Sequence, residues 1–577
     1  MKKGNKIADN EQKFEEISLN STKKIKEPST TINKEKKEFN KLSGSIFQLF
    51  NMESQKLFAL LILFAINLLN YMDRFTIAGI LGDVKKFYDL DDKMAGFLQT
   101  VFIIFFMIFA PVFGFLGDSL YLFLDNLNGF NRKLIILFGL LVWVLAVFAS
   151  SFVPNEHYIL FFLLRGVVGI GEASYAVVAP TFLADMFVGK TRSRVLMFFY
   201  FAIPVGSGLG YVIGSFVTSI AKGGRTDCSD CWQWGIRSTP IFGILTIIGL
   251  LLGVEEPVRG QVDREETDGQ VERDNLHNQI NPSNNPNITT VTTFNDKLLH
   301  FCQDLGYLAK NQTFIWSTVA YTAVVFVTGT LAWWAPTCIE EAIVWHKNIT
   351  NATDVTDTQN VSLNFGIITC AAGILGVSLG TVVSLAWKRG MWIFANCANI
   401  RSDALVSAIG SFLATPLLFL AIKLIDLNYI NIAWFILFLT ILFLCLNWAV
   451  NVDMLMAIIV PHRRGIASAV QILISHAFGD ASGPWIVGAI SDFVSGGDKT
   501  PKTHFHSLLV AFYLPNILLF LSGIAFLLAA YKLPSDLKKA EEWKKIPRTA
   551  DTGHIPESSS TPSNMLYQSH ENDAFEP

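Results

Sequence analysis

The sequence has few charged residues for its length. Asp, Glu, Lys and Arg make up 16% of 577 residues, whereas hydrophobic residues make up 51%. Soluble domains carry about 25% charged residues, so this composition excludes an ordinary soluble domain. The formal net charge of −3 offers no basic surface for nucleic acid. We find no nucleophile with a neighbouring base, no phosphate-binding loop and no metal cluster, so we expect no enzyme, no cofactor and no metal site.

Cysteine is also scarce, with seven residues too scattered for a disulfide framework. Cys228 and Cys231 form the one close pair, in a polar loop. Their spacing suits a local disulfide or half of a zinc site. No second pair or histidine cluster follows, which argues against zinc. A disulfide outside the cytosol and no role at all both remain open.

Long hydrophobic runs are plentiful. They come in blocks of about 20 residues, the length that spans a bilayer as a helix. Residues 1–54 are polar and lack the apolar region of a cleavable signal peptide, so we expect the first span to act as the insertion signal. Membrane-spanning helices are predicted over Leu57–Leu81, Ala95–Leu116, Leu134–Val153, Tyr158–Phe187, Val195–Ile220, Thr239–Val254, Phe314–Ile339, Val361–Trp387, Leu405–Ile425, Ile430–Ile459, Ile466–Val494 and Leu508–Tyr531.

The predicted fold class is therefore an all-α membrane protein with 12 transmembrane helices in two sets of six. Between the sets lies a polar segment whose composition predicts disorder, ending in a short amphipathic helix over Asn295–Leu308 on the membrane surface. The predicted domains are a disordered tail (1–54), a six-helix bundle (55–254), a linker (255–312), a second six-helix bundle (313–533) and a disordered tail (534–577).

Basic residues predict the orientation. One set of loops carries Arg132 with Lys133, Lys388 with Arg389, and Arg463 with Arg464. Because cytoplasmic loops are enriched in Lys and Arg, we place these loops, both tails and the linker in the cytoplasm. Glycosylation sequons in the opposite loop after the seventh span agree with this orientation, and they begin at Asn348, Asn351 and Asn360.

Four charged residues lie inside the apolar spans of the first half. Asp73 and Arg74 are adjacent in the first span, and Arg165 and Glu172 are two helical turns apart in the fourth. Intramembrane charges are expensive and usually face a partner or a water-filled cavity. A carboxylic acid away from a cation holds its proton more tightly than one beside an arginine. We hypothesise that re-pairing of these charges couples proton binding to conformation; the structural alternative is a static lattice that locks helices together.

An internal repeat relates the two halves. The fifth and eleventh spans each begin after basic residues and reach a patch rich in Gly, Ser and Pro about four turns later. Corresponding elements of this kind are typical of duplicated transporter halves. These patches are Pro204–Gly210 and Gly479–Pro484.

Several long motifs resemble those of the spinster family within the major facilitator superfamily. They are NYMDRFTIAG at 70–79, RGVVGIGEASY at 165–175, YFAIPVGSGLG at 200–210, NW at 447–448, PHRR at 461–464 and QILISHAFGD at 471–480. The resemblance covers roughly Leu57 to Leu533. It implies two six-helix bundles with alternating access.

The resemblance also implies a substrate and a location. Family members transport amphipathic lipids, namely sphingolipids including sphingosine phosphate, or lysophospholipids. They act at late endosomes and lysosomes or at the plasma membrane. The family pattern assigns proton coupling to the acids matching Asp73 and Glu172, so we expect a proton gradient as the driving force, a lipid substrate and a monomer. Alternatives are a proton-coupled transporter of a small organic anion, or a transport-inactive lipid sensor or scaffold.

Binding and gating residues are expected on spans that line the central cavity. An arginine could hold a lipid phosphate, and Asn with aromatic residues suits an amphipathic ligand. Trp333 could instead be a membrane-interface anchor, and His476 either a titrating or a packing histidine. The candidates are Asn70, Arg74, Arg165, Tyr175, Tyr321, Thr328, Trp333, Asn447, Trp448 and Asn451.

The loop after the second span departs from the superfamily pattern. Gly114 and Asp118 match its first part and Arg132 its last, but residues 119–130 form an apolar-rich insert where an arginine is expected. The insert either alters gating or is a retained piece of the gene model; the cleanly resuming flanks favour the second. On the second half, Arg463 and Arg464 are the matching gate residues, with Asp453 the expected partner of Arg463.

Overall fold

The computed structural model describes residues 54–123, 132–187, 189–223, 228–255, 294–347, 356–460, 463–498 and 500–545. Most of both predicted tails, most of the linker and the sequons at Asn348 and Asn351 lie outside these residues. Asn360 lies on a helix, but its side chain is not described. The glycosylation sites therefore remain predictions.

Every regular element of the described residues is helical, and eleven helices are long and apolar enough to cross a membrane. The first half contains α3 (Ser54–Gly79), α4 (Leu81–Tyr88), α5 (Asp92–Phe123), α6 (Arg132–Ser150), α7 (Tyr158–Met186), α8 (Gly189–Tyr200), α9 (Ala202–Lys222) and α10 (Trp232–Gly253). The second half contains α13 (Gln312–His346), α14 (Thr356–Arg389), α15 (Ser402–Asp426), α16 (Ile430–Ile458), α17 (Arg464–Ser475), α18 (Gly483–Ser495), α19 (Pro501–Ala511) and α20 (Tyr513–Lys545). Between the halves lies α12 (Phe294–Lys310).

The predicted eleventh span is not a continuous α-helix. Its segment is α17, a π-helical turn (His476–Asp480) and α18. Pro484 follows the turn at the start of α18, where its missing N–H costs no hydrogen bond. The count of twelve spans stays a prediction because this broken segment is not among the eleven long apolar helices.

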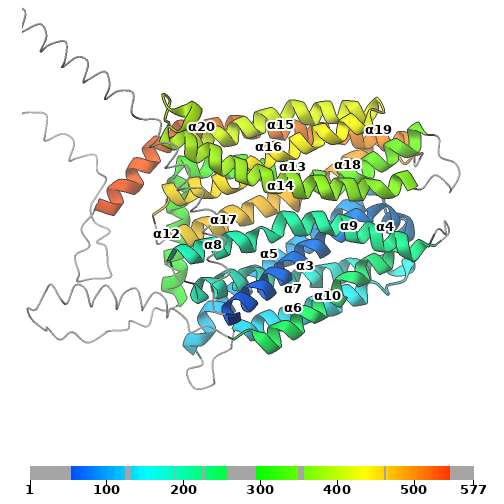
Figure 1. The fold of residues 1–577 in the computed structure, drawn as a ribbon, viewed down its shortest axis with the longest axis horizontal. Helices are drawn as coiled ribbons and strands as arrows, with labels where there is room; N and C mark the ends of the chain where they lie inside the picture. The colour runs from blue at the N-terminus through cyan, green and yellow to red at the C-terminus, as the bar shows by residue number, and fades with distance from the viewer. Residues whose placement is uncertain are drawn as a thin grey trace, which may run out of the picture.

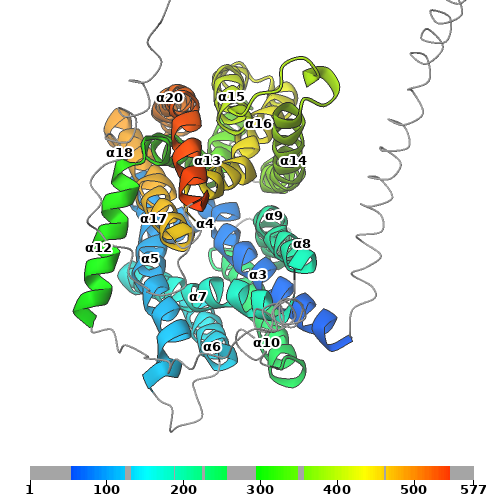
Figure 2. The same ribbon diagram turned by 90° about the vertical axis from the view of Figure 1, so that its left-hand side faces the viewer.

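The helices form two groups that run side by side (Figures 1 and 2). Figure 2 shows α13, α14, α15, α16 and α20 in one group, and α3, α5, α6, α7 and α10 in the other. The groups meet along two helix pairs, α9 with α14 and α5 with α18. This arrangement agrees with the predicted fold class of two helical bundles.

The two glycine-rich patches, one in the fifth span and one in the eleventh, pack these spans against the first helix of their own half. A Cβ at Gly210 on α9 would lie 2.5 Å from the Met72 carbonyl of α3, and one at Gly483 would lie 3.0 Å from the Phe326 carbonyl of α13. Small residues, and glycine above all, allow backbones to approach this closely. The sequence repeat therefore corresponds to a repeated helix contact.

Helix α12 lies across one end of the molecule, which we call the α12 end (Figure 1). Its Asp304 forms an ion pair of 2.7 Å with Arg463, and the Arg463 guanidinium lies 4.6 Å from the Tyr307 ring centre. The expected pairing of Arg463 with Asp453 is therefore wrong, because α12 supplies a closer carboxylate. The short helix itself was predicted.

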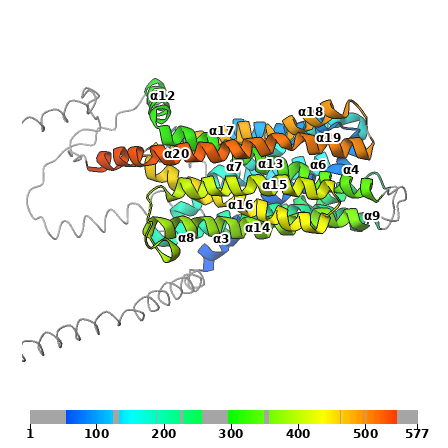
Figure 3. The same cartoon turned by 90° about the horizontal axis from the view of Figure 1, so that it is seen from above.

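Helix α20 projects beyond the other spans at the α12 end (Figure 3) and continues twelve residues into the predicted C-terminal tail. Asp536 explains the extension: its carboxylate accepts hydrogen bonds from the backbone N–H and hydroxyl of Thr313, 3.0 and 2.8 Å away, at the start of α13. The predicted boundary at residue 534 was placed too early, because this contact is not visible in local hydropathy.

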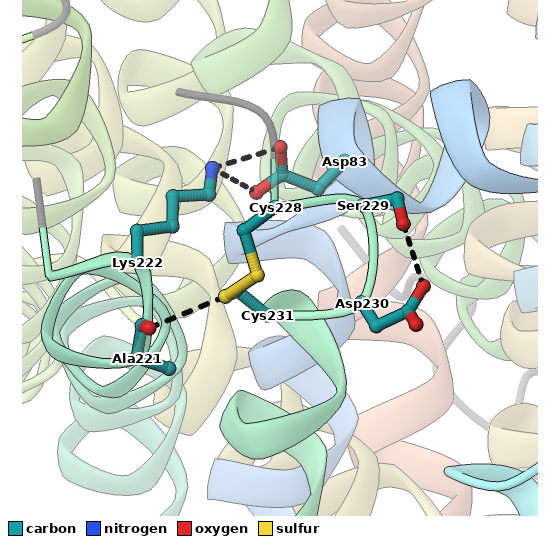
Figure 4. Close-up of a disulfide and its surroundings, with 7 residues drawn as sticks. All are labelled: Asp83, Ala221, Lys222, Cys228, Ser229, Asp230 and Cys231. Carbon is teal, nitrogen blue, oxygen red and sulfur yellow. Dashed lines mark hydrogen bonds and ion pairs between the residues drawn. A yellow bond between two sulfur atoms is a disulfide. The ribbon is translucent and has the colours of Figure 1, made fainter. Parts of the chain in front are cut away.

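At the opposite end, which we call the α4 end, Cys228 and Cys231 form a disulfide (Figure 4). It closes the short connection between α9 and α10. Nearby, Lys222 at the end of α9 forms an ion pair of 2.8 Å with Asp83 on α4. Of the alternatives for this cysteine pair, the structure therefore favours the disulfide.

Candidate functional site

Asp73 is the most fully satisfied of the four charges predicted inside the spans of the first half. Its side chain is 1% exposed, and Arg165 of α7 forms an ion pair with it at 3.1 Å. Thr239 of α10 donates to the other carboxylate oxygen at 2.7 Å, and Trp143 of α6 lies within 3.4 Å. Four helices therefore converge on one carboxylate, as expected for a buried ion pair that must keep all its hydrogen bonds.

Glu172 lies on the same helix as Arg165 but has a different environment. It is 2% exposed, and no ion pair within 4.0 Å joins it to a described residue. With its amide nitrogen turned to Glu172, Asn70 donates to both carboxylate oxygens at 2.9 and 3.1 Å. The charges acting on Glu172 include those of Arg74, Asp73 and Arg165. All four predicted charges therefore belong to one electrostatic cluster.

Arg74 is the least satisfied member of this cluster. It is 7% exposed and forms neither an ion pair nor a hydrogen bond with the described residues, and its Nε is buried without a partner. Its guanidinium lies 4.7 Å from the ring centre of Phe102, with Tyr71 and Phe106 at 5.9 Å. A cation stacked on aromatic rings keeps its N–H groups available for an anion.

Tyr175 fixes the position of α3 against α7. Its hydroxyl donates to the Asn67 side-chain oxygen at 2.6 Å, and Asn67 in turn donates to the Phe199 carbonyl of α8 at 2.9 Å. Tyr175 is 1% exposed. This geometry gives Tyr175 a positioning role between three helices rather than direct access to a ligand.

The second half faces this cluster through the π-helical turn. His476 and Asp480 form a pair at 2.8 Å on the turn, and the His476 ring centre lies 6.3 Å from that of Phe106 on α5. Tyr321 of α13 interacts electrostatically with Asp480 and with Tyr71 of α3. Sequence reasoning missed Asp480 as a site residue; the signal was its place in the Gly479–Pro484 patch, because π-turns are frequent at functional sites.

A second set of polar side chains lies among the helices of the second half. Asn451 donates to Gln471 at 3.0 Å, and Gln471 donates to Thr318 at 3.2 Å, which links α16, α17 and α13. Asn447 is fully buried, and among the described residues neither of its side-chain polar atoms nor the buried Nε1 of Trp448 has a hydrogen-bond partner. Unpaired buried polar atoms are costly, so these side chains remain good candidates for contact with a ligand or ordered water.

Trp333 and Thr328 of α13 form hydrogen bonds outside the charge cluster. Trp333 is 2% exposed and donates to the Ala95 carbonyl of α5 at 3.1 Å, so the interface-anchor alternative is wrong and the residue joins the two halves. The Thr328 hydroxyl donates within its own helix, to the Val325 carbonyl. No group of three or more His, Cys, Asp or Glu side chains in the described ranges could hold a metal ion.

Comparison with known proteins identifies the family. Residues 63–400 match the model of the Major Facilitator Superfamily. "Protein spinster homolog 1" of Xenopus laevis is 38% identical over 521 residues, covering 90% of this chain and 89% of the relative, and that of Bos taurus is 40% identical over 479 residues, covering 82% and 81%. The chain belongs to the spinster family.

Solved structures show the same fold. A bacterial homolog of the human lysosomal transporter spinster, in an inward-facing and unoccupied conformation, superposes with a TM-score of 0.63 at 17% identity, covering 84% of this chain and 99% of that one. Its inward-facing, occupied form gives a TM-score of 0.64 at 16% identity, with the same coverage. In this spinster chain, hydrogen bonds join the first half to the second. Among the described residues these bonds lie between the middle of the helices and the α4 end, and Trp333–Ala95 and Thr100–Ala481 are examples.

The residues predicted to form the gate lie near the α12 end. Arg132 forms an ion pair of 2.6 Å with Asp185 at the end of α7, and Arg464 donates to the Ile459 carbonyl at 3.2 Å. Gly114 is half-buried on α5, whereas the side chain of Asp118 is not described. Helix α5 continues through the first residues of the insert to Phe123; the rest of the insert lies outside the described residues.

Proposed function

We propose that this spinster-family transporter moves an amphipathic lipid, a sphingolipid such as sphingosine phosphate or a lysophospholipid, in exchange with or together with protons. The late endosomal or lysosomal membrane is the proposed location, with the plasma membrane as the alternative. The observation that carries the proposal is the unequal pairing of the buried charges: Asp73 is ion-paired with Arg165, while Arg74 has no ion-pair partner in the part of the chain that the structure describes.

Arg74 is the proposed contact for the lipid head group. Its guanidinium is buried, stacked on Phe102 and free of a carboxylate partner, which suits bidentate binding of a phosphate. Phe106 and Tyr71 lie beside it and offer apolar surface for the part of the lipid's hydrocarbon chain that is nearest the head group. Arg165 is the weaker candidate, because a head group there would have to displace Asp73.

Glu172 is the proposed proton carrier. Asn70, its hydrogen-bond partner, is neutral, so Glu172 can be neutralised without breaking an ion pair, whereas protonation of Asp73 would strand Arg165 in the membrane. Binding of an anionic head group to Arg74 would neutralise the positive charge that acts on Glu172. Substrate binding at Arg74 and protonation of Glu172 are then thermodynamically linked, because these two residues interact electrostatically.

Reconstitution in liposomes tests the proposal. Uptake of labelled sphingosine phosphate, sphingosine, lysophospholipids and short organic anions is measured with and without a pH gradient. We expect gradient-dependent flux of one or more lipids. Flux of short anions alone would support the organic-anion alternative, and no flux of any compound would support the lipid-sensor alternative.

The Glu172→Gln variant tests the proton site. We expect lipid flux to lose its dependence on the pH gradient while the protein still reaches the membrane in folded form. Glu156→Gln, an exposed residue between α6 and α7, is the matched control and should behave as wild type. A Glu172→Gln protein with the wild-type pH dependence would contradict the assignment of Glu172.

A further inference from the structure

A cluster of polar side chains joins the two halves at the α4 end, remote from the Asp73 site. We call it the α4-end cluster. The first half contributes side chains from α4 and α5, and the second half contributes side chains from α13, α18 and α19. Its members are Lys85, Asp92, Glu341, Ser491, Asp492 and His504.

Asp92 is the centre of this cluster. It is 1% exposed and forms an ion pair with Lys85 of its own half. From the other half, Ser491 donates to it at 2.7 Å, and His504 Nε2 lies 2.9 Å from each of its carboxylate oxygens. A buried carboxylate of the first half therefore takes most of its side-chain partners from the second half.

Asp492 makes a reciprocal contact. Its carboxylate accepts the backbone N–H groups of Asp92 at 3.0 Å and of Lys93 at 2.7 Å, which are the first two residues of α5. The first N–H groups of a helix lack partners within the helix, and the positive end of the helix dipole favours a carboxylate. The second half thus caps a helix of the first half, so separating the halves leaves these N–H groups without this partner.

His504 is the member of this cluster whose side chain type has an unperturbed pKa near neutral pH. Asp92 faces it from α5, Glu341 faces its Nδ1 from α13 at 3.5 Å, and Lys85 lies 3.2 Å from its Nε2 on α4. Asp91 and Asp492 add further negative charge near Asp92. With a neutral imidazole, Lys85 alone opposes Asp92 and Glu341. A protonated imidazole balances the two carboxylates and can donate from both nitrogens.

We propose that His504 is a proton-binding site whose occupancy holds the α4 end closed. Protonation gives His504 a donor on each ring nitrogen, so that it can donate to both Asp92 and Glu341, and it turns both contacts into hydrogen bonds between opposite charges. These contacts exist only while the halves meet at this end, so a proton bound there favours the closed conformation. The charge distribution predicts that this end faces a lumen or the outside. An acidic lumen would then drive the transporter toward opening at the α12 end.

The inference rests on alternating access of two bundles and not on any lipid, so it can fail independently of the proposed function. Spin labels at Glu156→Cys on the first half and Lys502→Cys on the second report the separation of the halves at the α4 end. Both positions are exposed. The exposed Cys302 and Cys397 are replaced by Ser, and the protein is measured in lipid nanodiscs without substrate.

On lowering the pH from about 7.5 to about 5, across the titration range of histidine, we expect the closed-to-open ratio to rise on the order of tenfold. His504→Gln should abolish this response, and His504→Lys should stay closed at both pH values. His506→Gln is the matched control: His506 is on the same helix and packs on Trp345 of its own half, so its loss should leave the response intact.

Glu341→Gln provides a second test that leaves Asp92 and His504 in place. Because Glu341 stabilises the protonated imidazole, its neutralisation should move the midpoint of closure to lower pH. A wild-type protein without a pH response, a His504→Gln protein that responds as wild type does, or an unchanged midpoint in Glu341→Gln would each overturn the proposal.

Discussion

Asp73 and Arg74 are neighbours in sequence but have different partners. Successive residues of a helix point about 100° apart, so Asp73 turns to Arg165 and Thr239 while Arg74 turns to Phe102. The sequence alone indicated that both residues were buried charges. It did not indicate that Asp73 would be held by a threonine and a tryptophan from two other helices.

The Thr239→Val variant tests how far these hydrogen bonds support the ion pair. The substitution keeps the shape of the side chain and removes the donor to Asp73, so we expect a loss of about 2 kcal/mol, typical of a hydrogen bond to a charged group. Thermal unfolding in detergent measures it. Thr246→Val is the matched control, since the Thr246 hydroxyl donates only to the Gly243 carbonyl of the same helix. Equal losses in the two variants would show that the Asp73 contact contributes nothing specific.

At the scale of elements, close backbone contact sets how the halves meet. Gly208 of α9 and Gly366 of α14 face each other: a Cβ on either would lie 2.5 Å from the other's carbonyl oxygen. Tyr211 of α9 lies beside this contact and donates to the Ala332 carbonyl of α13. At Gly208 and Gly366 the α9–α14 contact therefore leaves no room for a side chain.

The Gly366→Val variant should force α9 and α14 apart. Overpacking of this kind costs about 1–3 kcal/mol. Here it destabilises the conformation in which the α4 end is closed. We expect the Glu156–Lys502 spin-label distance to lengthen at every pH. Gly465→Val, at a glycine with open space around it, is the control. An unchanged distance in Gly366→Val would mean that this contact does not limit the approach of the halves.

At the scale of the whole molecule, the two ends differ in cysteine chemistry. The disulfide of Cys228 and Cys231 lies at the α4 end. The exposed free cysteines are Cys302 on α12 and Cys397 in the connection between α14 and α15, both at the α12 end. This asymmetry matches the predicted orientation, with the α12 end in the reducing cytosol.

Labelling with a membrane-impermeant maleimide tests that orientation. In intact cells we expect no labelling, because Cys302 and Cys397 face the cytosol and a disulfide does not react. Permeabilisation of the plasma membrane should allow both residues to react. The double variant Cys302→Ser, Cys397→Ser controls for background and should lose the signal. Labelling of plasma-membrane protein in intact cells would contradict the predicted orientation and show that the α12 end faces outward.

The sequence by itself determined the all-helical membrane fold, the family and the four buried charges, because hydropathy, charge and local motifs are properties of short stretches. It also indicated the α12 helix and the repeated glycine patches. Helix ends were less well predicted: α20 continues past residue 534 because Asp536 caps α13, a contact between residues far apart in the chain.

Only the tertiary structure decided which charges pair. Arg165 rather than Arg74 holds Asp73, and α12 rather than Asp453 holds Arg463. The α4-end cluster joins residues up to 419 positions apart, from Lys85 to His504. Such pairings depend on the packing of the halves, since a side chain's partner is set by which helix lies opposite it and not by its neighbours in sequence.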